Sequence, residues 1–136
     1  MISTRGRYAL RVLIDLAEHA GENYIPLKDV AGRQAISVKY LERIMAELKK
    51  AGIIEGTHGK GGGYRLVKSP EEYRVGDILR ITEGDLAPVA CLSNGSEPCE
   101  RSEKCRTISM WRKFDEITND YFNNITISDL MKKSGE

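Results

Sequence analysis

Residues 27–44 read LKDVAGRQAISVKYLERI, and the fold can be inferred by starting from these residues. It holds two short amphipathic helical patterns joined by the tight connection Gln34-Ala35-Ile36, and Ser37 is a good N-cap for the second helix. Two helices cross this closely only where the residue at the crossing is small, here Ala31, while Ile36 tucks into the core between them. The stretch therefore predicts a helix-turn-helix, although most helical hairpins do not bind DNA.

The second helix of this motif is expected to begin after Ser37 and to end at Ala51-Gly52. Its apolar residues recur at helical spacing and are Leu41, Ile44, Met45 and Leu48. Lys39, Tyr40 and Arg43 lie largely off this stripe. We predict that the stripe is buried and that these three side chains are candidates for reading base edges.

The flanking sequence extends the motif on both sides. Upstream, Ser3 or Thr4 can cap a first amphipathic helix that stops at Gly21. Downstream, the β-prone stretches 53–55 and 64–67 enclose a glycine-rich run and predict a β-hairpin with a long tip. A helix-turn-helix followed directly by a hairpin is the winged-helix arrangement. In that arrangement the third helix enters the major groove and the hairpin tip lies against the DNA backbone or minor groove.

The glycine-rich run does not indicate a nucleotide-binding loop. Residues 59–63 read GKGGG, which lacks the order G-x-x-x-x-G-K-[ST], and they precede a strand rather than a helix. Glycine here lets the backbone approach a groove and adopt positive φ, and a plain flexible hairpin tip is the alternative.

Charge is distributed unevenly along the 136 residues. Residues 1–68 hold 12 Lys and Arg against 7 Asp and Glu, a net charge of +5, whereas residues 69–136 hold 9 against 13, a net charge of −4. The basic side chains on the expected DNA-binding elements are Arg5, Arg7, Lys39, Arg43, Lys60 and Arg65. Their attraction to phosphate is mainly independent of sequence and sensitive to salt. Solvated faces of opposite charge are the alternative.

Several function classes are excluded. The chain is too short for a barrel enzyme, and it shows neither a nucleophile–base pair nor an H-E-x-x-H motif, so we expect no enzyme. No run approaches the roughly 18 apolar residues of a membrane span, and residues 1–5 lack the apolar core of a secretory signal. We expect a cytoplasmic protein without a membrane partner.

The acidic half predicts a short helix, a loop and a long helix. Val75, Ile78, Leu79 and Thr82 mark a helix ending near Gly84, and residues 85–106 show no period. From Thr107 a long helix is expected, with Ile108, Trp111, Phe114, Ile117 and Tyr121 as its apolar stripe. A partner helix from a second copy can cover this stripe, and an intrachain core contact is the alternative. Ser128 is the expected cap of a last short segment.

The fold class is thus mainly α with a small β-hairpin. We divide the chain into a winged helix-turn-helix DNA-binding domain at 1–84, a cysteine-containing loop at 85–106, and a dimerisation helix with a C-terminal segment at 107–136.

Three cysteines, Cys91, Cys99 and Cys105, lie within 15 residues. An odd number argues against a disulfide framework, and structural zinc sites usually bring paired CxxC ligands or a nearby His. Thiolates on a loop suit an iron–sulfur cluster, whose fourth ligand can come from elsewhere, and thiols without a metal are the alternative.

Four segments together resemble the IscR/NsrR/CymR family of bacterial transcription regulators, and the resemblance covers nearly the whole chain. They are Ile2–Leu10, Ile36–Glu42, Gly61–Leu66 and Asn124–Leu130. The resemblance implies a homodimeric winged-helix repressor or activator, dimerised through the long helix. It implies DNA contacts by Ser37, Lys39, Tyr40, Arg43, Lys60, Gly61, Gly62 and Gly63. To these candidate DNA-binding residues we add Arg5, because it is a basic residue of the first helix. Glu42 matches a family position that tunes which operator class is accepted.

The cysteine loop decides the branch of the family. The trio Cys91, Cys99 and Cys105, followed by Trp111, resembles the ligands of the branch that carries a [2Fe-2S] cluster and regulates iron–sulfur biogenesis. The position of the histidine ligand of the best-known members is Ile108 here. A carboxylate of Glu97, Glu100 or Glu103, a residue of the partner subunit, or an exogenous thiol remains possible as the fourth ligand.

Two other branches and one other class stay open. Members that respond to cysteine metabolism lack the cysteine trio. Nitric oxide sensors of the family use an acidic N-terminal residue where Arg7-Tyr8 stands here. A redox or metal interaction module that never touches DNA is the competing class.

Overall fold

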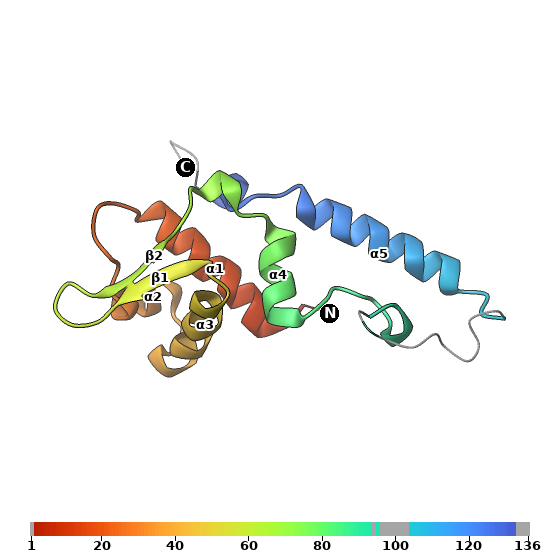
Figure 1. Cartoon of the computed structure of the whole chain (residues 1–136), viewed down its shortest axis with the longest axis horizontal. Helices are drawn as coiled ribbons and strands as arrows, with labels where there is room; N and C mark the ends of the chain where they lie inside the picture. Colours follow the sequence, from red (N-terminus) through yellow and green to blue (C-terminus); the bar gives the residue numbers. More distant parts are fainter. Residues whose placement is uncertain (1, 94, 96–103, 133–136) are drawn as a thin grey trace.

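The computed structural model describes residues 2–93, 95 and 104–132. Figure 1 shows a head of helices and one hairpin, from which a long helix extends to one side. In chain order the elements are α1 (Thr4–Glu18), α2 (Leu27–Gln34), α3 (Val38–Lys50), β1 (Ile54–Thr57), β2 (Gly63–Leu66), the 3-10 turn η1 (Pro70–Glu72), α4 (Val75–Glu83), the 3-10 turn η2 (Ala90–Leu92), α5 (Ile108–Asn123) and α6 (Ile127–Leu130). The expectation of a mainly α fold with a small hairpin is confirmed.

Helix α1 is the central helix of the head. Ser3 is its N-cap, and the Ser3 Oγ accepts a hydrogen bond from the Gly6 amide at 3.4 Å. Val12, Leu13 and Leu16 are buried at the middle of the main core. Helix α1 packs against α2, α3, α4, β2 and α6, so most elements of the head are arranged around it.

The helix-turn-helix forms as the sequence predicts. Ala35, at the turn, has the left-handed backbone conformation with φ of 54°, and the next residue, Ile36, is buried. Ser37 caps α3, its Oγ accepting from the Tyr40 amide at 3.2 Å. The apolar stripe of α3 is buried as expected, with Leu41, Ile44, Met45 and Leu48 each at most 1% exposed.

The hairpin β1–β2 forms the wing and is antiparallel. Residue Tyr64 also pairs with Ile25 in the loop before α2, each amide donating to the other's carbonyl at 2.9 Å. Gly63 has φ of 149°, and a Cβ there would overlap the Ile25 carbonyl. Glycine is therefore needed at 63 so that the wing can lie directly against the head.

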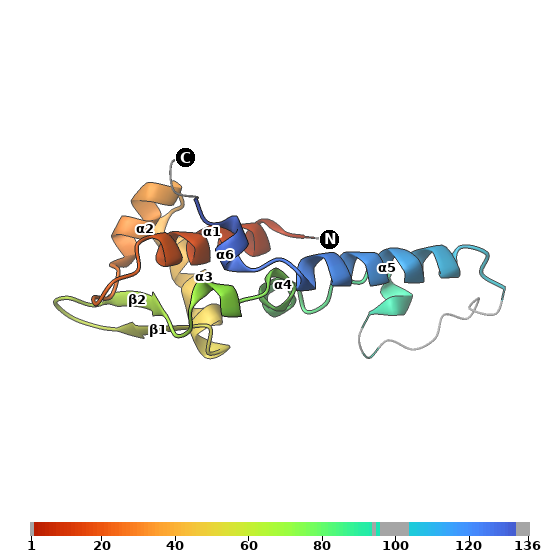
Figure 2. The ribbon, with the colours of Figure 1, turned by 90° about the horizontal axis from the view of Figure 1, so that it is seen from above.

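The acidic half leaves the head and returns to it. Helix α4 ends at Gly84 as expected, and α5 projects away from the head (Figure 2). After α5 the chain comes back, and Ile127 of α6 is fully buried in the main core. The expected cap at Ser128 was wrong: Thr126 caps α6, its side chain accepting from the Asp129 amide at 3.1 Å, because Asp129 completes a capping box.

Candidate nucleic-acid interface

The outward face of α3 is open to solvent. Lys39, Glu42 and Arg43 are exposed on it, and Val38 at its start is 44% exposed. The opposite face of the same helix is buried in the head. A helix held in this way presents its outer side chains on a rigid support, which is the geometry that groove binding requires.

Tyr40 lies at the edge of this face and is half-buried. Its ring packs edge-on against Tyr8 of α1, with ring centroids 5.7 Å apart. The Arg11 guanidinium lies over the Tyr8 ring, 5.0 Å from its centroid. Tyr40 is thus a packed aromatic side chain at the rim of the interface, and the Ser37 hydroxyl is engaged in capping α3.

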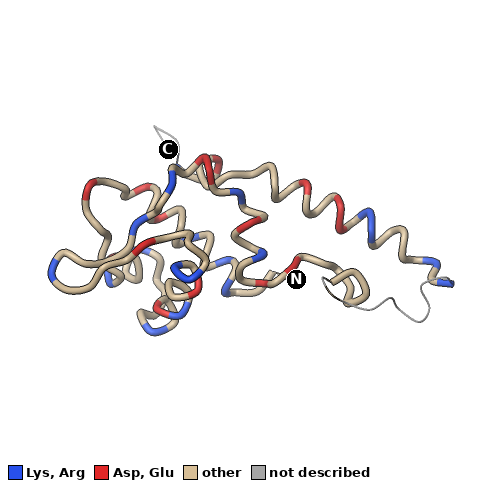
Figure 3. The backbone as a smooth tube through the Cα atoms, in the orientation of Figure 1, with Lys and Arg blue, Asp and Glu red and all other residues tan. Residues whose placement is uncertain are grey.

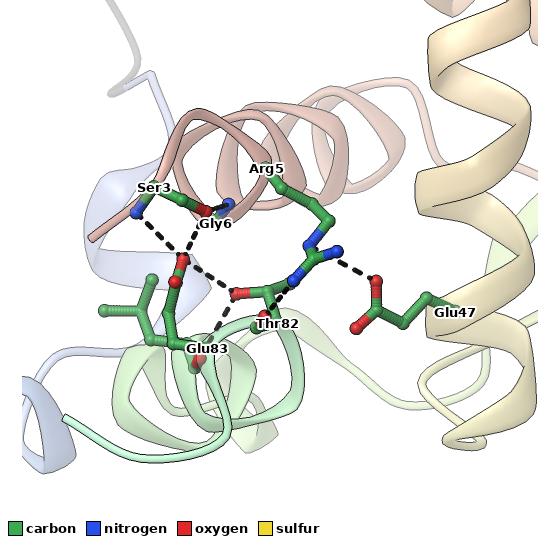
Figure 4. Close-up of polar contacts among 7 residues, drawn as sticks. Ser3, Arg5, Gly6, Glu47, Thr82 and Glu83 are labelled. Carbon is green, nitrogen blue, oxygen red and sulfur yellow. Dashed lines mark hydrogen bonds and ion pairs between the residues drawn. The ribbon is translucent and has the colours of Figure 1, made fainter. Parts of the chain in front are cut away.

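Arg5 is engaged inside the head. Its Nη2 donates to the Thr82 carbonyl at 2.7 Å, and its Nε lies 3.6 Å from Glu47 Oε2 on α3 (Figure 4). The side chain of Arg5 is nevertheless about half exposed. Residues 5, 47 and 82 are far apart along the chain, so no local pattern predicts this contact.

A basic position stands at the tip of the wing, which extends away from the head (Figure 3). Lys60 and Gly61 are exposed, whereas Gly62 and Gly63 are half-buried. Gly59 and Gly61 adopt positive φ with open space around them, and a Cβ at Gly62 would overlap the Thr57 carbonyl. The glycines therefore shape the hairpin tip itself.

A groove of about 430 Å³ lies between the wing, α2 and α3. Lys28, Glu42, Lys49 and His58 line it together with backbone of the wing. Spacing in the sequence did not single out Lys28, Lys49 or His58 as interface residues, because only the folded wing brings them next to Glu42.

The apolar face of α5 is uncovered. Phe114, Ile117 and Tyr121 are 53%, 55% and 63% exposed, and Met110, which the sequence analysis missed, is 54% exposed. Ile108 and Trp111 are half-buried. Trp111, Phe114, Ile117 and Tyr121 also line a groove of about 580 Å³, which Ile2, Leu86 and Pro88 close on the other side.

Two of the three cysteines lie in the described part of the chain. Cys91 belongs to η2, and Cys105 lies just before α5 with its Sγ 3.5 Å from Thr107 Oγ1; both residues are half-buried. Cys99 and the carboxylates Glu97, Glu100 and Glu103 lie outside the described residues. Within residues 2–93, 95 and 104–132, no three His, Cys, Asp or Glu side chains form a group that could hold a metal ion.

A family model named Rrf2, described as an iron-dependent transcriptional regulator, matches residues 2–133. The chain belongs to the Rrf2 family. The IscR transcriptional regulator of Vibrio campbellii is 34% identical over 96% of this chain and 77% of that protein. IscR of Pectobacterium carotovorum is 35% identical over 96% and 78%. The resemblance on which the sequence analysis relied is therefore confirmed.

Solved structures of Rrf2-type regulators share the fold. CymR, the global cysteine regulator of B. subtilis, superposes with a TM-score of 0.77 at 33% identity, covering 96% of this chain and 95% of that one. IscR of T. potens superposes with a TM-score of 0.72 at 33% identity, covering 96% and 85%. This Rrf2 chain is thus a winged-helix transcriptional regulator and not an enzyme. None of the helices within its described ranges is long and apolar enough to cross a bilayer.

Buried polar contacts fix the helix-turn-helix in this Rrf2 chain. Asp15 of α1 is 1% exposed, and its carboxylate accepts from Arg33 Nε at 3.0 Å, Arg33 Nη2 at 2.8 Å and Gln34 Nε2 at 2.9 Å. Burial alone would raise the pKa of Asp15, but the hydrogen bonds from Arg33 and Gln34 outweigh it and lower the pKa below 3.8. The charged carboxylate therefore ties the end of α2, and with it the turn, to α1.

The wing is held by a second polar group. The Arg65 guanidinium pairs with Glu55 across the hairpin and stacks on Tyr24, 4.2 Å from the ring centroid. Hydrogen bonding to Glu55 raises the pKa of Arg65. Arg65, which the sequence analysis counted among the phosphate-attracting residues, joins the two strands of the wing to the loop before α2.

Proposed function

We propose that this chain is a homodimeric regulator that binds duplex DNA through α3 and the wing and that responds to an iron–sulfur cluster on its cysteines. One observation carries the DNA-binding part: α3 is buried along one face and exposed along the other, where Lys39, Glu42 and Arg43 project. Such a protein would act in the cytoplasm.

In this proposal α3 enters the major groove and the wing tip lies along the backbone. Lys39 and Arg43 reach base edges or phosphates, and Glu42 restricts which bases are accepted, because a carboxylate accepts from cytosine but repels phosphate. Lys60 supplies charge at the wing tip, while Gly61 allows the backbone to approach closely. Ser37 and Tyr40 support α3 and border the contact.

The homodimer forms through α5. No residue of this 16-residue helix is fully buried, yet four large apolar side chains share one of its faces. Burying a fully exposed large apolar side chain is worth roughly 1.5–3 kcal/mol, and each of these four has slightly more than half of its surface exposed. Covering the exposed part of all four favours association. A second copy of the chain offers an identical face, and a two-fold axis lets the two faces cover each other and presents two DNA-binding heads.

Cys91, Cys99 and Cys105 would hold the cluster, with [2Fe-2S] as the proposed type. The donor set fits, because soft thiolates are the ligands that iron–sulfur clusters use. A bound cluster would supply a group whose occupancy and charge vary with iron supply and oxidation. The chain's own part is to offer two half-buried thiols, Cys91 and Cys105, at the two ends of the segment that precedes α5. Ile108 offers no ligand atom, so the fourth ligand must come from elsewhere.

Salt dependence of duplex binding tests the DNA-binding part. Each phosphate contact is expected to lower log K by about 0.9 per tenfold rise in salt. A steep linear fall supports the proposal. A flat response, or no binding to any duplex of a randomised pool, supports a redox or metal interaction module instead.

An anaerobic absorption spectrum with iron and sulfide counts tests the cluster. A coloured protein that is bleached by Cys99→Ala is the expected result. The likeness to CymR of B. subtilis favours a second candidate, a regulator that responds to cysteine metabolism. A colourless anaerobic protein without iron, still binding DNA, would support that second candidate and contradict the cluster.

A further inference from the structure

Arg5 connects three helices of the head at one point (Figure 4). Its guanidinium donates to the carbonyl of Thr82, in the last turn of α4, and lies 3.6 Å from the carboxylate of Glu47 on α3. Across residues 2–93, 95 and 104–132, this is the only ion pair to which α3 contributes. The connection is therefore a specific polar link between α3 and the rest of the head.

The α4 side of this link is firmly held. Ser3 donates to Glu83 Oε1 from its amide at 3.0 Å and from its hydroxyl at 2.7 Å. Thr82 is buried, and a Cβ at Gly6 would overlap both Glu83 Oε1 and Thr82 Oγ1, so α1 and α4 touch closely here. The Thr82 carbonyl is thus a fixed acceptor for Arg5.

The α3 side lies at the edge of the proposed DNA-binding face. Glu47 follows Arg43 by four residues, so the two side chains are neighbours on the helix surface. Arg5, Tyr40, Arg43 and Glu47 line a hollow of about 420 Å³ together with Ser3, Thr4 and Ile44. The Glu47 side chain is 31% exposed, so the pair is partly shielded from water.

We propose that Arg5 and Glu47 are positioning residues that hold α3 at a fixed angle to the end of α4, so that its outer side chains meet DNA in register. The proposal rests on the DNA-binding function proposed above. A half-exposed ion pair adds little to overall stability, so DNA affinity, and not unfolding, is the quantity that tests this role. Because α4 ends at Glu83, two residues before the cysteine loop begins at residue 85, the same link joins α3 to the end of the helix that leads into this loop.

A direct phosphate contact by Arg5 is the competing interpretation, and the two predict opposite signs for Glu47→Gln. If Glu47 positions Arg5 and α3, removing its charge weakens DNA binding. If Arg5 contacts phosphate, Glu47 competes for its guanidinium and repels DNA, and removing the charge strengthens binding.

The experiment is a double-mutant cycle of Arg5→Met and Glu47→Gln in the full chain. Fluorescence anisotropy measures affinity for a duplex that the wild-type protein selects from a randomised pool, and for an unrelated duplex of equal length. We expect Glu47→Gln to lower affinity for the selected duplex threefold to tenfold with an unchanged salt slope. Arg5→Met should cost less in the Glu47→Gln background than alone.

Glu71→Gln, which removes the same charge from exposed η1, is the matched control and should change affinity less than twofold. Equal or tighter binding by Glu47→Gln, or additive effects in the cycle, would overturn the positioning role of Arg5 and Glu47 while leaving DNA binding intact. A wild-type protein without salt-dependent duplex binding would overturn both proposals. Thermal unfolding of each variant verifies that it is folded.

Discussion

Helices α3 and α5 are both amphipathic and of similar length, but the apolar face of α3 is buried and that of α5 is exposed. The apolar face of α3 is buried within its own head, with Leu41 and Met45 fully covered. The apolar face of α5 is open, with Phe114 and Ile117 more than half exposed. Helical periodicity in the sequence is equally clear in both. The spacing of apolar residues therefore predicts that a helix has an apolar face, but it does not predict which surface covers that face.

The two helices also differ in what their exposed faces carry. The exposed face of α3 is charged, with Lys39, Glu42 and Arg43, whereas α5 exposes an apolar face in addition to a charged one. A charged face on a rigid helix suits a polyanion, and an apolar face of this size suits a protein partner.

Leu48→Ala on α3 is expected to lower the free energy of unfolding by about 3 kcal/mol, because it removes a fully buried side chain and leaves a cavity. Urea unfolding at several protein concentrations measures the loss, which should not depend on concentration. Phe114→Ala on α5 is the counterpart, and its loss should vary with concentration. A concentration-independent loss for Phe114→Ala would show that α5 is covered by its own chain.

Ile117→Lys is expected to raise the dissociation constant of the homodimer by about a hundredfold, which corresponds to about 2.8 kcal/mol. The reason is that a two-fold axis places the buried charge in the interface twice. Sedimentation velocity over a dilution series measures the change. Glu116→Lys, on the opposite side of α5, introduces the same charge at a solvent-exposed position and should leave association within twofold. Equal effects of the two substitutions would argue against an α5 interface.

Asp15→Asn is expected to cost about 2 kcal/mol of unfolding free energy at pH 7, because Arg33 loses its charged partner beside α1. The pKa of Asp15 is lower in the folded protein than its value of about 3.8 in the unfolded chain. The stability that the charged Asp15 adds is therefore complete at pH values above about 3.8. It is lost as the pH falls through the lower pKa of the folded protein. Urea unfolding from pH 7 to pH 3 should show the difference shrinking at the acid end.

The exposed carboxylate of Asp120 provides the control for this pH series. Asp120→Asn on α5 should change stability by less than about 0.5 kcal/mol at every pH. A difference between wild type and Asp15→Asn that stays constant down to pH 3 would contradict the assigned role of the Asp15 carboxylate.

Lys39→Ala is expected to have the smallest effect on the fold, within about 0.5 kcal/mol, because the side chain is exposed on α3. It should nevertheless weaken duplex binding and reduce the salt slope by about 0.9, as expected for one lost phosphate contact. Anisotropy titrations at several salt concentrations measure both. If the salt slope is unchanged and affinity falls for the selected duplex but not for an unrelated duplex, Lys39 contacts a base edge instead of a phosphate.

Local chemistry made much of the fold predictable. Ser3 and Ser37 cap helices where short polar side chains precede apolar repeats, and Gly84 ends α4, because each signal acts within one turn of the chain. The cap of α6 was misassigned, since Ser128 and Thr126 are both suitable cap residues and only the capping-box partner Asp129 decides between them.

The contacts that join distant segments were not predictable. Arg5 with Glu47, Asp15 with Arg33, and Ile25 with Tyr64 each link residues separated by many positions. Such contacts depend on how elements pack, and a single sequence gives no information on which charged side chain meets which. Because the sequence does not show which carboxylate Arg65 meets, Arg65 was grouped with the DNA-binding charges; in the structure it pairs with Glu55 inside the wing.

Residue type and short-range spacing are enough to assign which segments are helical or extended, which faces are apolar, and which segments carry positive charge and thiols. Three features emerge only when the chain is packed: α6 returns to complete the core, Arg5 bridges α4 and α3, and the α5 face stays uncovered. The physical reason is that burial and ion pairing depend on distances between elements, and packing of the whole chain sets those distances.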